Sequence, residues 1–202
     1  MSIIDTLLEE NTFLTTDIAS HQLRFVLRCL DITLKKNLQG DIVELGCYEG
    51  TTSLFIRRVL DFYKPDKQFF VYDSFERPLL NPHRANICLK QDELYPQTEK
   101  KRFIRNFSDE GLELPIINEG WFADIPDEKY PDKISFAFFG GDSYVSVTDS
   151  FVKTYHKLSP CSIVCVRNYT QVRDVRKACL RFLADKPEVI FASRGLGYMV
   201  KE

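Results

Sequence analysis

The chain has 202 residues, of which 44% are hydrophobic and 28% are charged, a balance typical of a globular protein with a full core. Its 27 basic and 29 acidic residues give a net charge of −2, which offers no electrostatic reason to bind nucleic acid or an anionic membrane. No apolar run is long enough to span a membrane, and the acidic first residues lack the basic start of a signal peptide. We therefore expect one cytoplasmic domain over residues 1–202.

Regular elements alternate along the first third of the chain. Apolar residues recur at helical spacing up to Gly40, which we expect to stop the helix. The predicted elements are, in order, a short helix and a loop within 1–20, a helix over 19–38, a strand over 41–46, a helix over 51–63 and a strand over 68–72. The residues before the first strand form an expected helical cap, about 1–38.

The connection that follows, about residues 77–112, is long and irregular, and connections of this length usually have a function. We expect a lid-like insertion with one charged helical segment over 97–106. His83 lies in it and is a candidate for contact with an acceptor, although an exposed loop histidine is the simpler interpretation.

Strands and helices alternate again in the second half. The predicted elements are strands over 114–118 and 134–139, a helix over 145–158 closed by Pro160, a strand over 161–166, a helix over 172–184 and a hairpin of 188–193 and 197–201. This alternation is typical of an α/β fold with a mainly parallel seven-stranded sheet, helices on both faces and a C-terminal antiparallel hairpin.

None of the six cysteines forms a C-x-x-C pair, and several lie in apolar runs. Buried, reduced thiols are the simplest interpretation. Cys161 and Cys165 share one predicted strand, which indicates packing and not a metal site.

The stretch from Glu44 to Ser53 joins a strand end, a tight turn and the start of a helix. Gly46 and Gly50 let the backbone come close to a ligand, and the free N–H groups of the first helical turn point at it. Glu44 disfavours a phosphate and favours a ligand with positive charge or hydrogen-bond donors. The G-x-x-x-G spacing differs from the G-x-G-x-x-G of dinucleotide sites. An ordinary turn between strand and helix is the alternative.

Two further strand ends carry candidates for binding a nucleoside. Asp73 ends the second strand, where a carboxylate commonly binds a ribose diol, although it could also cap a turn. Glu119 and Gly120 follow the third strand, and Trp121 could stack on an adenine ring or belong to the core.

Four stretches together resemble the macrocin O-methyltransferase (TylF-like) family, whose members methylate sugar hydroxyls on antibiotics and other glycosides. The matching stretches are Glu44-Leu-Gly-Cys-Tyr-Glu-Gly50, Asp73-Ser-Phe-Glu76, Gly120-Trp-Phe-Ala-Asp-Ile-Pro126 and Gly140-Gly-Asp-Ser-Tyr-Val-Ser146. The resemblance implies a Rossmann-like class I fold, S-adenosyl-L-methionine (SAM) as methyl donor and a sugar or glycan as acceptor. It also implies a SAM site made of Glu44, Gly46, Cys47, Tyr48, Gly50, Thr51, Thr52, Ser53, Asp73, Ser74, Glu119, Gly120 and Trp121.

The chain departs from the family pattern where the family binds a divalent cation. The first Asp of the family's D-G-D is Gly140, and the acidic pair after the fifth strand is replaced by Arg167 and Asn168. Magnesium prefers several oxygen ligands, so we expect no metal. Asp142 remains as the candidate general base, Arg167 would supply the missing positive charge, and Asn168 would hydrogen-bond the acceptor. The further candidates for acceptor contact are Tyr144 and Tyr169.

Two other functional classes are weighed against this hypothesis. A catalytically dead protein could keep the SAM fold as an interaction module, because three acidic positions are lost. An NAD-linked oxidoreductase is disfavoured by the glycine spacing. A homodimer is expected from the family resemblance alone.

Overall fold

The structure is a computed structural model that describes residues 2–75 and 100–202. The strands within these ranges are β1 (Asp41–Leu45), β2 (Phe69–Asp73), β3 (Ile116–Glu119), β4 (Ile134–Phe139), β5 (Leu158–Val166), β6 (Phe191–Ser193) and β7 (Leu196–Val200). The α-helices are α1 (Ile3–Glu10), α2 (Ser20–Lys35), α3 (Thr51–Tyr63), α4 (Lys100–Asp109), α5 (Tyr144–Thr154) and α6 (Arg173–Phe182). Two short 3₁₀ helices are η3 (Asp127–Lys129) and η4 (Tyr155–Lys157).

The strands form a seven-stranded sheet in the order β3-β2-β1-β4-β5-β7-β6. The first five strands pair in parallel, while β7 is antiparallel to both β5 and β6. The predicted mainly parallel sheet with a C-terminal antiparallel hairpin is therefore confirmed.

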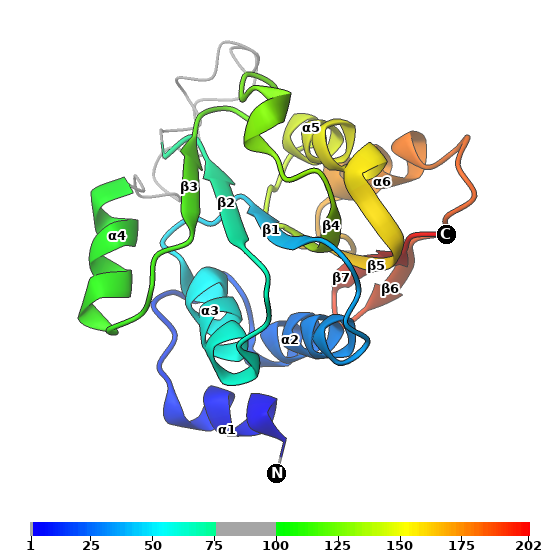
Figure 1. The fold of residues 1–202 in the computed structure, drawn as a ribbon. Helices are drawn as coiled ribbons and strands as arrows, with labels where there is room; N and C mark the ends of the chain where they lie inside the picture. Colours follow the sequence, from blue (N-terminus) through cyan, green and yellow to red (C-terminus); the bar gives the residue numbers. More distant parts are fainter. Residues whose placement is uncertain (1, 76–99) are drawn as a thin grey trace.

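Helices cover both faces of the sheet, with α2 and α3 on one face and α5 and α6 on the other (Figure 1). Successive residues of a strand point to opposite faces, so the side chains of the fully buried β4 pack alternately into the hydrophobic cores on the two sides of the sheet. Phe136 and Phe138 belong to the core under α2 and α3. Phe139 belongs to the core under α5, where its ring lies edge-on to Phe151 at 5.0 Å between centroids.

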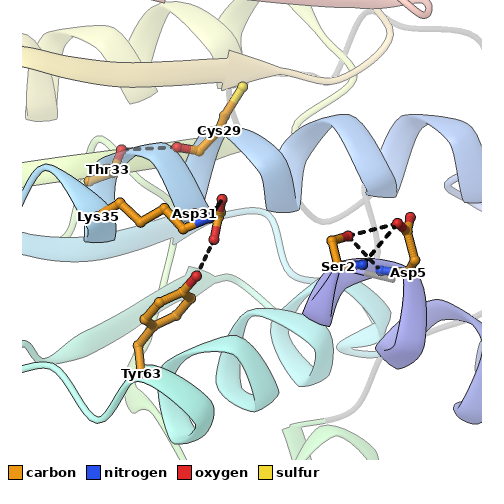
Figure 2. A network of polar contacts seen from close by, with 7 residues as sticks. All are labelled: Ser2, Asp5, Cys29, Asp31, Thr33, Lys35 and Tyr63. Carbon is orange, nitrogen blue, oxygen red and sulfur yellow. Dashed lines mark hydrogen bonds and ion pairs between the residues drawn. The ribbon is translucent and has the colours of Figure 1, made fainter.

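Figure 2 shows polar contacts within α1 and α2, and one contact that joins α2 to α3. The hydroxyl of Ser2 accepts a hydrogen bond from the backbone N–H of Asp5, which caps the start of α1. The hydroxyl of Tyr63, at the end of α3, donates to Asp31 of α2. Lys35, one turn further along α2, also binds Asp31 at 2.8 Å. The predicted helical cap is therefore attached to the helix that follows the glycine turn.

Two boundary predictions and one burial prediction were wrong for local reasons. Helix α2 ends at Lys35, before Gly40, because Asn37 adopts a left-handed conformation at φ 48°. Pro160 does not close α5 but lies inside β5, whose pairing with β4 jumps between Leu158 and Ile163. This irregularity also gives Cys161 a φ of 65° and leaves its thiol exposed, not buried as expected.

Part of the predicted lid-like insertion lies outside the described residues, and His83 belongs to that part. Its described end forms α4, which lies beside β3 and continues to Asp109, three residues beyond the expected end at Asn106 (Figure 1). The rings of Phe103 and Phe107 on α4 are fully buried in the core on the α3 side. None of the helices within residues 2–75 and 100–202 combines the length and the apolar character that crossing a membrane requires.

We predict that Phe107→Ala lowers the free energy of unfolding by about 3–5 kcal/mol, because it removes a fully buried ring next to Phe103. Urea denaturation measures the change. The matched control is Phe62→Ala, whose ring is 57% exposed, and its loss should stay below about 1 kcal/mol. Equal losses in the two variants would contradict the packing of α4 described above.

Candidate active site

The carboxyl ends of the parallel strands bring the sequence candidates to one edge of the sheet. Asp73 at the end of β2 lies opposite Glu119 at the end of β3. Leu45 of β1 pairs with Phe139 of β4, which in turn pairs with Val166 of β5. The residues that follow these strand ends are consequently neighbours in space, as in other open α/β sheets that bind ligands at this edge.

The turn after β1 is tightly constrained. Gly46 and Gly50 have φ of 90° and 94°, and Tyr48 between them is also left-handed at 52°. One carboxylate oxygen of Asp73 accepts from the backbone N–H groups of Cys47 at 2.9 Å and Tyr48 at 3.0 Å. Asp73 therefore holds the turn in shape, which is the capping role weighed against ribose binding.

Burial shapes the ionisation of two groups at this turn. It raises the pKa of the Asp73 carboxyl, and the backbone N–H donors around it oppose that shift. Burial also raises the pKa of the Cys47 thiol well above its ordinary value. Cys47 is therefore a packed thiol and not a reactive thiolate.

Helix α4 closes over the same turn from the other side. The guanidinium of Arg102 lies 2.9 Å from the carboxylate of Glu49, and the side chain of Asn106 donates to the Glu49 backbone carbonyl at 2.9 Å. A side chain at Gly50 would lie 2.9 Å from the ring of Phe103. These contacts compensate for the left-handed conformation of Tyr48. Sequence reasoning missed this role of α4, since no motif marks it.

A cavity that opens to solvent lies between the turn, the start of α3 and the end of β5. The residues that line it come from four separate stretches, and they are Thr15, Asp17, Ile18, Glu44, Gly46, Cys47, Tyr48, Thr51, Thr52, Phe138 and Arg167. Seven of these were predicted as site residues. The segment between α1 and α2, which contributes Asp17, was not predicted.

Three buried polar atoms around this cavity have no hydrogen-bond partner among the described residues: Glu44 Oε1, Asp17 Oδ2 and Arg167 Nε. The other carboxylate oxygen of Glu44 accepts from the hydroxyl of Ser53 at 2.6 Å. Burial raises the pKa of Glu44 to about 8. Such groups are costly to leave unsatisfied, so the cavity is suited to a ligand that carries both positive and negative charge.

The candidates for the acceptor side lie on the neighbouring turns. Asp142 is half-buried between β4 and α5, and Tyr144 begins α5. Asn168 is left-handed at φ 60°, and its carbonyl accepts from Val172 N at 2.8 Å in the turn before α6. The ring of Tyr169 lies in the core, where a side chain at Gly197 would approach it to 2.8 Å, so packing is its observed role.

The region expected to border adenine is partly exposed. Gly120 has a φ of 147°, and its N–H donates to the Asp73 carbonyl at 3.0 Å, which joins the ends of β2 and β3. Glu119 is exposed and forms an ion pair with Lys100 of α4 at 3.1 Å. Trp121 is half-buried, whereas Ser74 is buried.

Position 140 has no room for a side chain. A Cβ added to Gly140 would lie 2.1 Å from the carbonyl oxygen of Gly46. The turn after β1 therefore occupies the space in which the family pattern places its first acid. Within residues 2–75 and 100–202, no three His, Cys, Asp or Glu side chains are grouped so that they could hold a metal ion.

Comparison with known proteins gives one family and one fold. The model of the macrocin O-methyltransferase (TylF) family matches residues 9–188. Mycinamicin III 3''-O-methyltransferase of Micromonospora griseorubida is 27% identical over 76% of this chain and 65% of its own length. Demethyldecarbamoylnovobiocin O-methyltransferase of Streptomyces niveus is 28% identical over 76% of this chain and 62% of its own length.

The O-methyltransferase NovP superposes with a TM-score of 0.81 over 91% of this chain and 81% of its own. Its sequence identity is 22%, so the superposition shows a shared fold. The expected Rossmann-like class I methyltransferase fold is confirmed. This chain spans only 57–65% of the length of the curated relatives that it matches.

We predict that Glu44→Gln makes the ligand-free protein more stable, increasingly so as the pH rises. The folded-state pKa of about 8 lies above the ordinary 4.5, so the folded protein keeps a proton that the unfolded chain releases between these values. Wild-type stability should fall across this window by up to about 1.4 kcal/mol per pH unit from this group. Glutamine removes that loss while it can still accept from Ser53.

Urea denaturation without ligand at pH 5 and pH 8 measures the difference. The matched control is Glu128→Gln on the exposed η3 turn, which should follow the wild type at both values. If the Glu44→Gln and wild-type stabilities change in parallel with pH, Glu44 does not carry the raised pKa.

Proposed function

The chain belongs to the macrocin O-methyltransferase (TylF) family, and from this premise we propose that it is a SAM-dependent O-methyltransferase acting on a hydroxyl of a sugar or glycan. The observation that carries the proposal is the unsatisfied carboxylate of Glu44, buried at the glycine turn and facing the cavity. The ionised form of this carboxyl would repel a phosphate, whereas a positively charged ligand would favour the ionised form and be held by it. The names of the matched relatives support an acceptor of the sugar class.

The residues around the cavity suit the methionine part of SAM. Glu44 would face its positive charge, and Gly46 and Gly50 keep the backbone clear of side chains. Helix α3 starts at Gly50 without a side-chain cap, so the N–H groups of Thr51 and Thr52 remain as donors. When bound, SAM supplies a methyl group that its sulfonium has already activated. Asp73 supports the turn, and its ribose contact stays a prediction.

The protein's own contribution to the reaction is to position the acceptor hydroxyl and to remove its proton. We assign proton removal to Asp142, which follows β4 on the same sheet edge as Glu44. General base catalysis typically contributes about 10²–10⁴-fold. Holding the reacting groups in line contributes up to about 7–11 kcal/mol in the best intramolecular models. Asn168 is assigned a hydrogen bond to the acceptor.

A metal-independent reaction is part of the proposal. The backbone of Gly46 fills the space that a side chain at position 140 would need. The other two positions of the family's metal site carry the guanidinium of Arg167 and the amide of Asn168. These residues do not suit Mg²⁺, which prefers oxygen ligands that include carboxylates. The cytoplasmic location and the homodimer stay predictions.

We predict that Asp142→Asn lowers kcat by about 10²–10⁴-fold while the affinity for SAM stays unchanged, because the amide cannot take the acceptor proton. Formation of S-adenosylhomocysteine (SAH) is followed with a panel of methyl glycosides of hexoses and 6-deoxyhexoses, with and without a chelator. The chelator should have no effect. Asp132→Asn, an exposed carboxylate before β4, is the control and should keep full activity.

Two outcomes would contradict this scheme. Strict dependence on added Mg²⁺ or Mn²⁺ would contradict the metal-independent mechanism. SAM binding without methylation of any glycoside would favour the interaction module over an enzyme.

We also predict that SAH binding releases a proton from Glu44 near neutral pH. Its carboxyl is mostly protonated in the free protein, with a pKa of about 8, and the nearby α-ammonium of bound SAH, the only positive charge of that ligand, would favour the ionised form. The affinity should therefore rise between pH 6 and pH 8. Calorimetry in two buffers of different ionisation enthalpy measures the protons released, and the same titration of Glu44→Gln subtracts those that SAH itself exchanges. Equal proton release in both proteins would rule out Glu44 as the source.

A further inference from the structure

We infer that Asp17 and Arg167 bind the two ends of the donor's amino-acid group, Asp17 the α-ammonium and Arg167 the α-carboxylate. This inference rests on the proposed function and extends it to Asp17, for which neither the family motifs nor the glycine turn provides a role. It also moves Arg167 from the acceptor side, where the sequence placed it, to the donor side.

The first observation is that opposite charges share one cavity without pairing. Asp17 and Arg167 both line it, and each has a buried polar atom that lacks a partner among the described residues. Buried groups of opposite charge usually pair, because an unpaired one loses its hydration without replacement. Here each group remains available to a ligand. A zwitterionic ligand between them would give both side chains a partner of opposite charge.

The second observation is the way Arg167 is held. It follows the last residue of β5, and its backbone N–H donates to the Phe139 carbonyl at 2.9 Å, which continues the sheet pairing past the strand end. The guanidinium therefore projects from the rigid edge of the sheet. Its planar donors match a carboxylate in a bidentate arrangement, which a lysine cannot reproduce.

The third observation is the anchoring of the segment that carries Asp17. The hydroxyl of Thr15 lies 3.2 Å from the hydroxyl of Thr51, the first residue of α3. Ile18 is buried at 3% exposure, and the backbone N–H of Ala19 donates to Gln22 at 3.1 Å. Asp17 is thus held from both sides above the start of α3. The loop between α1 and α2 forms a wall of the donor site.

The test compares each variant with the wild type for three ligands that differ in the amino-acid group. SAH carries the whole group and 5′-methylthioadenosine lacks it. Decarboxylated SAM keeps the amine, next to a methylated sulfonium, and lacks the carboxylate. Calorimetry with Asp17→Asn should show SAH affinity reduced by about 10- to 100-fold, as for the loss of a hydrogen bond to a charged group, and an unchanged affinity for 5′-methylthioadenosine. Arg167→Met should reduce SAH affinity similarly and bind decarboxylated SAM as well as the wild type does.

The exposed residues Asp132 and Arg181 supply the controls, Asp132→Asn and Arg181→Met, which should bind all three ligands normally. Arg167→Lys should recover part of the SAH affinity, and it carries the test if Arg167→Met does not fold. If a variant loses affinity for SAH and for 5′-methylthioadenosine equally, the substituted residue has a structural role and the inference is overturned. Unchanged affinity for SAH overturns it as well. Wild-type protein that binds none of the three ligands refutes the proposed function itself.

Discussion

The buried carboxylate of Glu44 is the constraint on which the rest of the site depends. It lies near the carboxyl end of β1, whose last four residues are buried. It receives one hydrogen bond from Ser53, and its other oxygen has no partner among residues 2–75 and 100–202. A buried carboxyl oxygen without a partner lowers the stability of the folded protein, and such groups are common at functional sites, where a bound ligand supplies the partner. The glycine turn and the first turn of α3 are arranged around that oxygen.

Support for the turn comes from elements far apart in the chain. Asp73 holds the backbone N–H groups of Cys47 and Tyr48, and Arg102 and Asn106 of α4 hold Glu49. The loop between α1 and α2 is joined to the start of α3 through paired hydroxyl groups. The proposed donor site therefore depends on the end of β2, on α4 and on the loop between α1 and α2, and not on the glycine motif alone.

The sequence predicted what local pattern determines. The bounds of α3 and β4 agree with the structure, because both are apolar runs with clear ends. It could not predict what tertiary contact determines. Asp17 belongs to no motif, and only folding brings it to the cavity. For Arg167, the family pattern gave the position on the sheet edge but not the wall of the cavity to which its side chain belongs.

The close approach of Gly46 to Gly140 couples two positions of the sequence. A side chain at position 140 would lie 2.1 Å from the carbonyl oxygen of Gly46, so the turn after β1 would have to shift before an aspartate could fit there. That turn also lines the proposed donor site. An acid at position 140 is thus epistatic with the glycine turn: a single substitution cannot introduce it without compensating changes in the turn.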